Sequence, residues 1–120
     1  NPAVNEPAKA IDNALERFSR EKANQKMTSR INKWSQDTGL IPSGFHFRKL
    51  AKRWGSCTNA NEIIINYDAI KLPFTIIDYI IVHELAHIKH KNHSREFYRE
   101  VAKYIPDWNL LDKKLYGMKL

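Results

Sequence analysis

One segment, FTIIDYIIVHELAHIKHK at residues 74–91, constrains the fold of this chain more than any other. It follows Pro73, and its apolar residues recur with the period of an α-helix that is well buried along one face. Histidine and glutamate side chains on such a helix are costly to bury unless they have a bound partner. The polar residues of this helix therefore indicate a functional site. The apolar residues are Ile76, Ile77, Ile80, Ile81 and Leu85.

The polar residues form the pattern H-E-x-x-H, with His83, Glu84 and His87 at its fixed positions. Residues four apart lie on one face of a helix, about 6 Å apart along its axis. Both imidazoles can therefore bind one Zn²⁺ at distances of about 2.0–2.1 Å. Glu84 lies about 100° around the helix from His83, so it can reach a water at the metal rather than the metal itself. The alternative is a pair of core histidines satisfied by hydrogen bonds.

His90 shares the same helical face but is a poor third ligand. In a straight helix its Cα would lie about 10.5 Å from that of His83. A histidine reaches its metal from roughly 6 Å, so a metal touching both rings would sit close to the helix and collide with His87. We expect His90 to face the cleft or the solvent.

His93 can reach the metal through a turn in the chain. Asn92 tolerates the left-handed conformation that ends helices, and Ser94 is a suitable N-cap for a further helix through about residue 104. A turn between them would return the His93 ring to the metal. We therefore predict His93 as the third ligand, with Glu96 or Glu100 from the following helix as the alternative.

Three protein ligands leave the fourth position of a tetrahedral zinc ion for water, which is typical of catalytic sites. Zinc acidifies that water and polarises a carbonyl, while Glu84 can accept the proton and carry it to the leaving amine. The pattern thus predicts a zinc-dependent metallopeptidase. It would hydrolyse peptide bonds of a polypeptide substrate through a zinc-activated water, with Glu84 as general base.

The remaining sequence predicts an α+β fold in one domain over residues 1–120. Phe45 and Phe47 alternate with polar residues as in a half-buried strand, an extended segment follows at 52–57, and EIIINY at 62–67 should be the returning strand. Because the chain begins with Asn1 rather than Met, we expect it to be a piece of a longer protein. The expected parts are a flexible lead-in at 1–7, a packing helix at 8–38, a small sheet at 39–67, and active-site and backing helices at 74–105.

The net charge of +7 and the pI near 9.6 support a second interpretation. The chain would be a basic domain that associates with nucleic acid and in which zinc is mainly structural. RKLAKR at 48–53, the pair of Lys89 and Lys91, and the basic first helix favour it. A lysine-rich solvated surface would explain the same charge.

Cysteine content and hydropathy bear on the location of the protein. Cys57 is the only cysteine of the sequence, so no internal disulfide can form and a reducing, cytoplasmic setting is expected. The longest apolar run, at residues 79–82, is far too short to cross a bilayer, so we expect no membrane association.

Three segments of the chain resemble the YgjP-like family of metal-dependent hydrolases, which is related to the SprT-like zinc metallopeptidases. The segments are RWGSC at 53–57, the following EIIINY, and DYIIVHELAHIKHKNHSREFY at 78–98. The resemblance extends over residues 13–115. It implies a minimal zincin-like fold with a long N-terminal helix, a small β-sheet, the HExxH active-site helix and a backing C-terminal helix. It also favours His93 over the glutamates as third ligand.

The resemblance further implies that the RWGSC strand is the sheet edge beside the cleft, where it would pair with the substrate backbone. Trp54, Gly55 and Ser56 are therefore candidate substrate-binding residues. A structural role would instead place Trp54 in the core, Gly55 at a bulge and Cys57 as a small buried residue. Partners that orient the metal-binding imidazoles are also expected, with the carboxylates at positions 78 and 107 as candidates.

Overall fold

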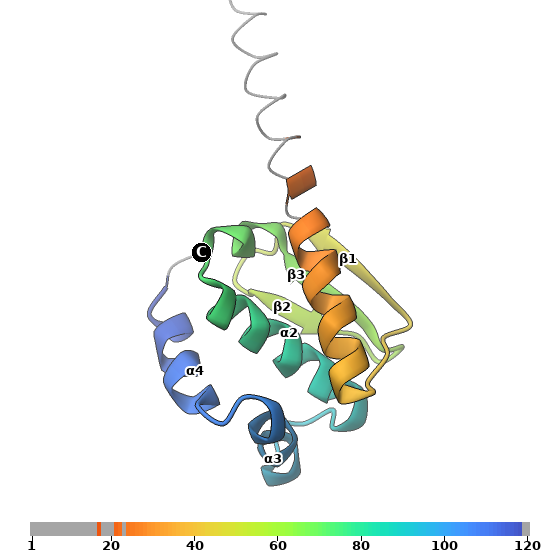
Figure 1. Ribbon diagram of the computed structural model, residues 1–120, viewed down its shortest axis with the longest axis vertical. Coiled ribbons are helices and arrows are strands. Elements are labelled where there is room, and N and C mark those ends of the chain that lie inside the picture. Colours follow the sequence, from red (N-terminus) through yellow and green to blue (C-terminus); the bar gives the residue numbers. More distant parts are fainter. Residues whose placement is uncertain (1–16, 18–20, 23, 119–120) are drawn as a thin grey trace, which may run out of the picture.

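The computed structural model describes residues 17, 21–22 and 24–118 (Figure 1). A helical segment at 24–38, here called the N-terminal helix, precedes a small sheet and a set of further helices. The predicted α+β class is confirmed, whereas the expected lead-in at 1–7 lies outside the described residues. The later elements are β1 (Gly44–Arg48), β2 (Gly55–Cys57), β3 (Glu62–Asn66), the 3₁₀ helix η1 (Tyr67–Lys71), α2 (Phe74–Lys89), α3 (Arg95–Tyr104) and α4 (Trp108–Tyr116).

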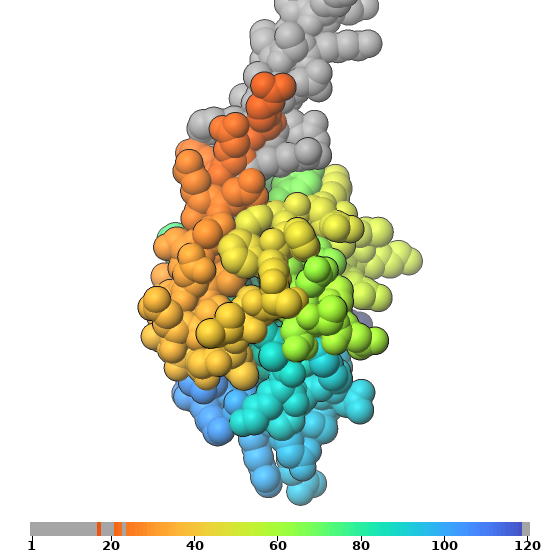
Figure 2. Space-filling model, turned by 90° about the vertical axis from the view of Figure 1, so that its right-hand side faces the viewer, coloured from red at the N-terminus to blue at the C-terminus, as the bar shows by residue number. Residues whose placement is uncertain are grey.

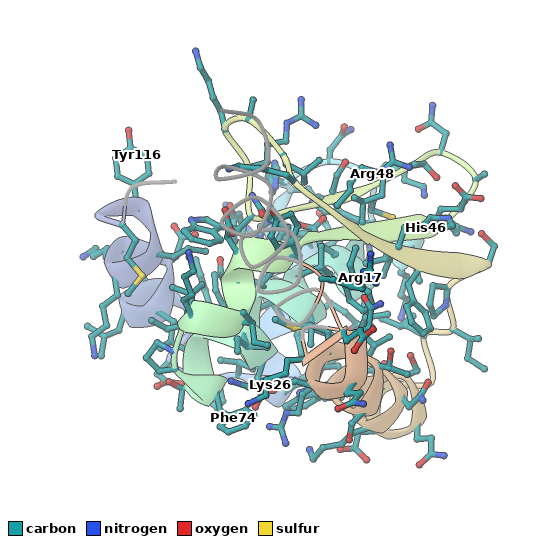
Figure 3. All side chains as sticks on the ribbon, turned by 90° about the horizontal axis from the view of Figure 1, so that it is seen from above. Arg17, Lys26, His46, Arg48, Phe74 and Tyr116 are labelled. Carbon is teal, nitrogen blue, oxygen red and sulfur yellow. The ribbon has the colours of Figure 1, made fainter. Side chains whose placement is uncertain are left out.

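The sheet has the order β1-β3-β2, with β1 parallel and β2 antiparallel to the central strand. β3 alternates fully buried Ile63 and Ile65 with the half-buried Ile64, so one face of the sheet meets the core. β2 is an edge strand that pairs Gly55 with Ile65 and Cys57 with Ile63. The outer face is more open, and Figure 3 shows His46 and Arg48 along β1, where both are exposed.

β2 and β3 are joined by a tight turn, as the sequence TNAN predicts. Asn61 adopts a positive φ of 65°, which asparagine tolerates better than most residues. The backbone N–H of Glu62 donates to the Thr58 hydroxyl at 3.0 Å. The Lys91 ammonium, from the segment after α2, donates to the Thr58 carbonyl at 3.2 Å and thereby ties this turn to the end of α2.

Asn66 holds the loop that leads into β2. Its side chain is fully buried, and its amide nitrogen donates to the carbonyls of Leu50 and Arg53 at 3.1 and 3.0 Å. Its amide oxygen accepts from the Asp68 N–H at 3.0 Å and so caps η1. These bonds hold Leu50 and Arg53 against Asn66, and β2 begins at Gly55, later than the expected extended segment at 52–57.

α2 crosses the core between the sheet and the last two helices (Figure 1). The N-terminal helix lies against it, and Arg30 forms a two-bonded ion pair with Asp78, with an Nε–Oδ1 distance of 2.8 Å. The Lys26 ammonium lies 4.2 Å from the centre of the Phe74 ring. Both side chains are labelled in Figure 3. Figure 2 shows the N-terminal helix and the β1 region side by side on one face, above the end of α2. None of the described helices is long and apolar enough to span a membrane.

Candidate metal centre

Three imidazoles converge beside the C-terminal half of α2. They belong to His83, His87 and His93 and are here called the histidine triad. His83 and His87 lie one turn apart on α2, and His93 lies in the connection between α2 and α3. The Nε2 atom of His93 is 3.2 Å from the Nε2 atoms of both helix histidines. All three ligand atoms lie within 4.8 Å of one another. The structure thus brings together the three histidines predicted as ligands.

The turn that brings His93 back begins earlier than expected. α2 ends at Lys89, and His90 takes an extended conformation with φ −130° and ψ 103°. Among the described residues other than glycine, a positive φ occurs at Asn61 alone, so the left-handed turn expected at Asn92 is wrong. Ser94 caps α3 as predicted, because its hydroxyl accepts from the Phe97 N–H at 3.3 Å. The early end frees the His90 carbonyl for a different role.

That carbonyl orients one imidazole of the triad. The Nδ1 atom of His87 lies 3.0 Å from the His90 oxygen, and a carbonyl can only accept, so Nδ1 carries the proton. The lone pair of His87 therefore lies on Nε2, the atom that faces the other two rings. The His90 imidazole itself is not part of the triad.

A second chain of hydrogen bonds orients His83. The Tyr79 hydroxyl donates to the Asp112 carboxylate at 2.8 Å and lies 3.3 Å from Nδ1 of His83. Since the hydroxyl proton points to the carboxylate, Nδ1 of His83 must donate to the hydroxyl oxygen. The Nε2 atom of His83 therefore also carries a lone pair toward the centre of the triad.

The residues present fit a cation of the size of zinc. The Nε2 lone pairs of His83 and His87 both face Nε2 of His93. A proton on that nitrogen could be donated to only one of them, so the other would lack a donor. Zn–N bonds of about 2.0–2.1 Å in a tetrahedral arrangement place ligand nitrogens about 3.3 Å apart, close to the observed separation. Burial, followed by the neighbouring His87 and His93, lowers the pKa of His83 to about 3, and burial lowers that of His87. The lowered pKa values favour the neutral form of both rings, which is the form that binds metals.

Phe97 forms the floor beneath the triad. Its side chain is fully buried, and its ring stacks on that of His87 with a centroid distance of 4.4 Å. Glu100, one alternative for the third ligand, instead pairs with Lys103 at 2.8 Å and Lys89 at 3.4 Å. Glu96, the other alternative, is exposed on the first turn of α3. Neither carboxylate belongs to the cluster.

Glu84 is buried between α2 and β2, with 7% of its surface exposed. A Cβ atom added to Gly55 would lie 2.9 Å from the Glu84 Oε2 atom, which is closer than real contacts allow. Glycine at this position therefore makes room for the carboxylate. Burial raises the pKa of Glu84 to about 8, although the Arg53 charge opposes the rise.

The triad and Glu84 open into a cleft of about 310 Å³ along β2. Of the candidate substrate-binding residues, Gly55 and Ser56 line this cleft, whereas Trp54 packs against the core and lines the neighbouring pocket. Cys57 is half-buried on the cleft wall, and burial raises the pKa of its thiol. The lining residues are Arg53, Gly55, Ser56, Cys57, Asn59, His83, Glu84, His87, Lys91 and His93.

The partners of the imidazoles were not found from the sequence. The two carboxylates named there lie elsewhere, since Asp78 pairs with Arg30 and Asp107 stands at the start of α4. Tyr79 occupies their place one turn before His83, a spacing that was visible in the sequence. Asp112 follows 33 residues later, and no local pattern connects it to the site.

Known proteins resemble this chain in sequence and in fold. The sequence model of the YgjP-like metallopeptidase domain matches residues 2–117. The metallopeptidase zymogen of Pyrococcus abyssi abylysin is 22% identical, with a TM-score of 0.67 over 74% of this chain and 90% of that one. The zymogen of Methanocaldococcus jannaschii jannalysin is 20% identical, with a TM-score of 0.66 over 75% of this chain and 93% of that one.

These two structures share the fold, which confirms the expected minimal metallopeptidase architecture. No curated protein sequence matches this chain. The family match extends over nearly the whole sequence, and the triad supplies a metal-binding donor set inside it. The chain belongs to the YgjP-like metallopeptidase family and is a metal-dependent peptidase.

Proposed function

We propose that this peptidase uses zinc, held by His83, His87 and His93, and that Glu84 is its general base. The observation that carries the proposal is the convergence of three imidazole nitrogens beside the buried Glu84 side chain in one cleft. Imidazole ligands suit zinc, and three of them leave a coordination position open.

Each residue of the site has a definable task. Bound zinc supplies a Lewis acid that acidifies water and polarises the scissile carbonyl. In its ionised form, the Glu84 carboxylate takes the proton from the attacking water and delivers it to the leaving amine. Glu84 extends from α2 and packs against Gly55 of β2, and this contact holds the carboxylate in place and shields it from solvent.

The open edge of β2 would bind the substrate backbone. The Trp54 carbonyl accepts from β3 at 2.9 Å, and the Thr58 N–H donates to β3 at 2.9 Å. Because facing residues of an antiparallel pair alternate, Gly55 and Cys57 direct their backbone groups away from β3. An extended polypeptide can pair with these free groups and pass across the cleft.

Metal removal tests the proposal directly. Treatment with a chelator should abolish hydrolysis of a fluorogenic peptide, and one equivalent of Zn²⁺ should restore it, because the triad is the proposed metal site. Mg²⁺ should not restore it, since that ion prefers oxygen ligands. Peptide hydrolysis and bound metal are measured on the same samples. Full activity in metal-free protein would rule out the zinc mechanism.

Tyr79→Phe should weaken zinc binding by about 10- to 100-fold, the usual effect of removing a group that orients a ligand. The substitution removes the acceptor of the His83 Nδ1 proton and leaves the buried ring in place. Tyr104→Phe is the matched control, because the Tyr104 hydroxyl bonds to the Thr38 carbonyl instead. Competition with a chromophoric chelator measures both affinities. Equal affinities in the two variants would contradict the assigned role of Tyr79.

A further inference from the structure

The charges that line the cleft are unevenly distributed. Arg53 and Lys91 contribute two cations, and Glu84 is the one carboxylate among the described residues of the lining. Glu84 lies buried against Gly55, whereas both cations are exposed to solvent. A polypeptide that enters the cleft therefore meets positive charge first.

Arg53 combines a fixed backbone with an exposed side chain. Its carbonyl accepts from the fully buried Asn66 at 3.0 Å, and the next residue, Trp54, packs against the core. Within the ranges that the structure describes, no group accepts a hydrogen bond from its guanidinium or forms an ion pair with it. Five N–H donors thus stand at the cleft wall.

Lys91 stands at the other end of β2 and is held by neutral groups. Its ammonium donates to the Thr58 carbonyl at 3.2 Å and to the Asn61 side-chain oxygen. Neither acceptor carries a charge, so the positive charge of Lys91 is not cancelled by its partners. These two bonds fix its position beside the turn that follows Cys57.

The two cations therefore flank the strand along which a substrate would lie. Arg53 precedes β2, and Lys91 contacts Thr58 just after it. Five residue steps of extended chain separate these points, which corresponds to about 16 Å. An extended polypeptide paired with β2 would carry residues on both sides of its scissile bond past these charges.

We propose that Arg53, together with Lys91, makes this cleft select polypeptides that carry carboxylates flanking the scissile bond. The proposal rests on the proposed peptidase function, because it concerns the same cleft. The carboxylate can come from an aspartate or glutamate side chain or from the free C-terminus of the polypeptide. A guanidinium binds either of them with two parallel hydrogen bonds.

A polypeptide fits this arrangement better than a nucleic acid does. Duplex DNA presents one negative charge per about 1.7 Å, and proteins that bind it use a continuous row of cations. The cleft instead offers two separate cations with a free strand edge between them. A strand edge recognises the backbone of another polypeptide.

Binding to a variant that cannot cleave tests recognition separately from hydrolysis. Zinc-loaded Glu84→Gln protein is titrated with fluorescent peptides that differ only in Glu or Gln on either side of the central bond. Further peptides carry a free or an amidated C-terminus and so separate the two sources of carboxylate. We expect the acidic peptide to bind about tenfold more tightly, as expected of hydrogen bonds to a charged group. A free C-terminus that gives the same gain would identify the terminal carboxylate as a ligand.

Substitutions in the same Glu84→Gln background identify the residue responsible. Arg53→Gln should reduce the preference for the acidic peptide to less than about twofold, because the unpaired guanidinium is its main source. Lys52→Gln is the matched control, since Lys52 is the adjacent cation but lines the neighbouring pocket. Arg53→Glu should reverse the preference, so that a peptide with Lys at the flanking positions binds more tightly than one with Glu.

The outcomes separate this proposal from the peptidase function. Equal binding and equal cleavage of the Glu and Gln peptides would overturn carboxylate selection and leave the peptidase standing. Selective binding without any cleavage by zinc-loaded wild-type protein would overturn the proposed hydrolysis and uphold carboxylate recognition. Tighter binding of a single-stranded oligonucleotide, weakened by Arg53→Gln, together with no preference between the peptides, would overturn the proposal in favour of nucleic acid.

Discussion

Glu84→Gln should lower kcat for peptide hydrolysis by about 10²- to 10⁴-fold, the range that a general base contributes. The amide of glutamine has nearly the same shape as the carboxylate but cannot accept the proton of the attacking water. The three imidazoles are untouched, so the variant should still bind one equivalent of zinc. Steady-state kinetics on a fluorogenic peptide and metal analysis of the same preparation measure the two properties.

A matched substitution separates this effect from a general loss of negative charge. Glu96→Gln removes an exposed carboxylate on α3 that lies outside the cleft lining, and it should leave kcat unchanged. Glu84 is buried with a raised pKa, so replacing it by a neutral group should not lower the thermal midpoint of unfolding. Full activity of Glu84→Gln protein, with zinc bound, would exclude Glu84 as the general base.

His93→Ala should weaken zinc binding by more than about 100-fold, because even the loss of a partner of a ligand costs 10- to 100-fold. The substitution removes the one ligand that does not lie on α2 and leaves two imidazoles one turn apart. Hydrolysis should fall with the metal occupancy. Titration against a chelator of known affinity measures the loss, and added zinc should restore part of the activity.

His90→Ala provides the comparison, since it removes an imidazole three residues away along the chain. The His90 backbone carbonyl, which fixes the His87 ring, remains in the variant. Its zinc affinity should therefore stay within about twofold of wild type, well below the effect of losing a ligand. A larger loss in His90→Ala than in His93→Ala would show that the wrong histidine has been assigned as third ligand.

The site was more predictable than the path of the chain around it. Spacing alone placed His83 and His87 on one face of a helix and excluded His90, and the structure groups the first two with His93. The prediction of a left-handed turn at Asn92 was wrong. Asparagine tolerates that conformation, but this tolerance does not show where the helix ends or which backbone carbonyl binds a side chain of the site. The helix ends at Lys89, and the freed His90 carbonyl binds His87.

Local strand pairing could be predicted from the sequence, whereas contacts between residues far apart along the chain could not. The antiparallel pairing of β2 and β3 follows from the short turn between them, and the sequence indicated it. The parallel pairing of β1 with β3 depends on contacts across 18 positions, such as Gly44 with Glu62. Asp112 lies on α4, 33 residues after its partner Tyr79, so its contact with the site could not be predicted from local sequence either.

The hydrogen-bond chain from Asp112 through Tyr79 to His83 has a thermodynamic consequence for the last helix. An ion that binds better to the oriented His83 ring also binds better when α4 is docked. The reason is that α4 carries Asp112, the last group of this hydrogen-bond chain. Linkage is reciprocal, so docking of α4 and loading of the ion must strengthen each other by the same factor. Detachment of this short C-terminal helix would thus loosen the ion without a change in any ligand.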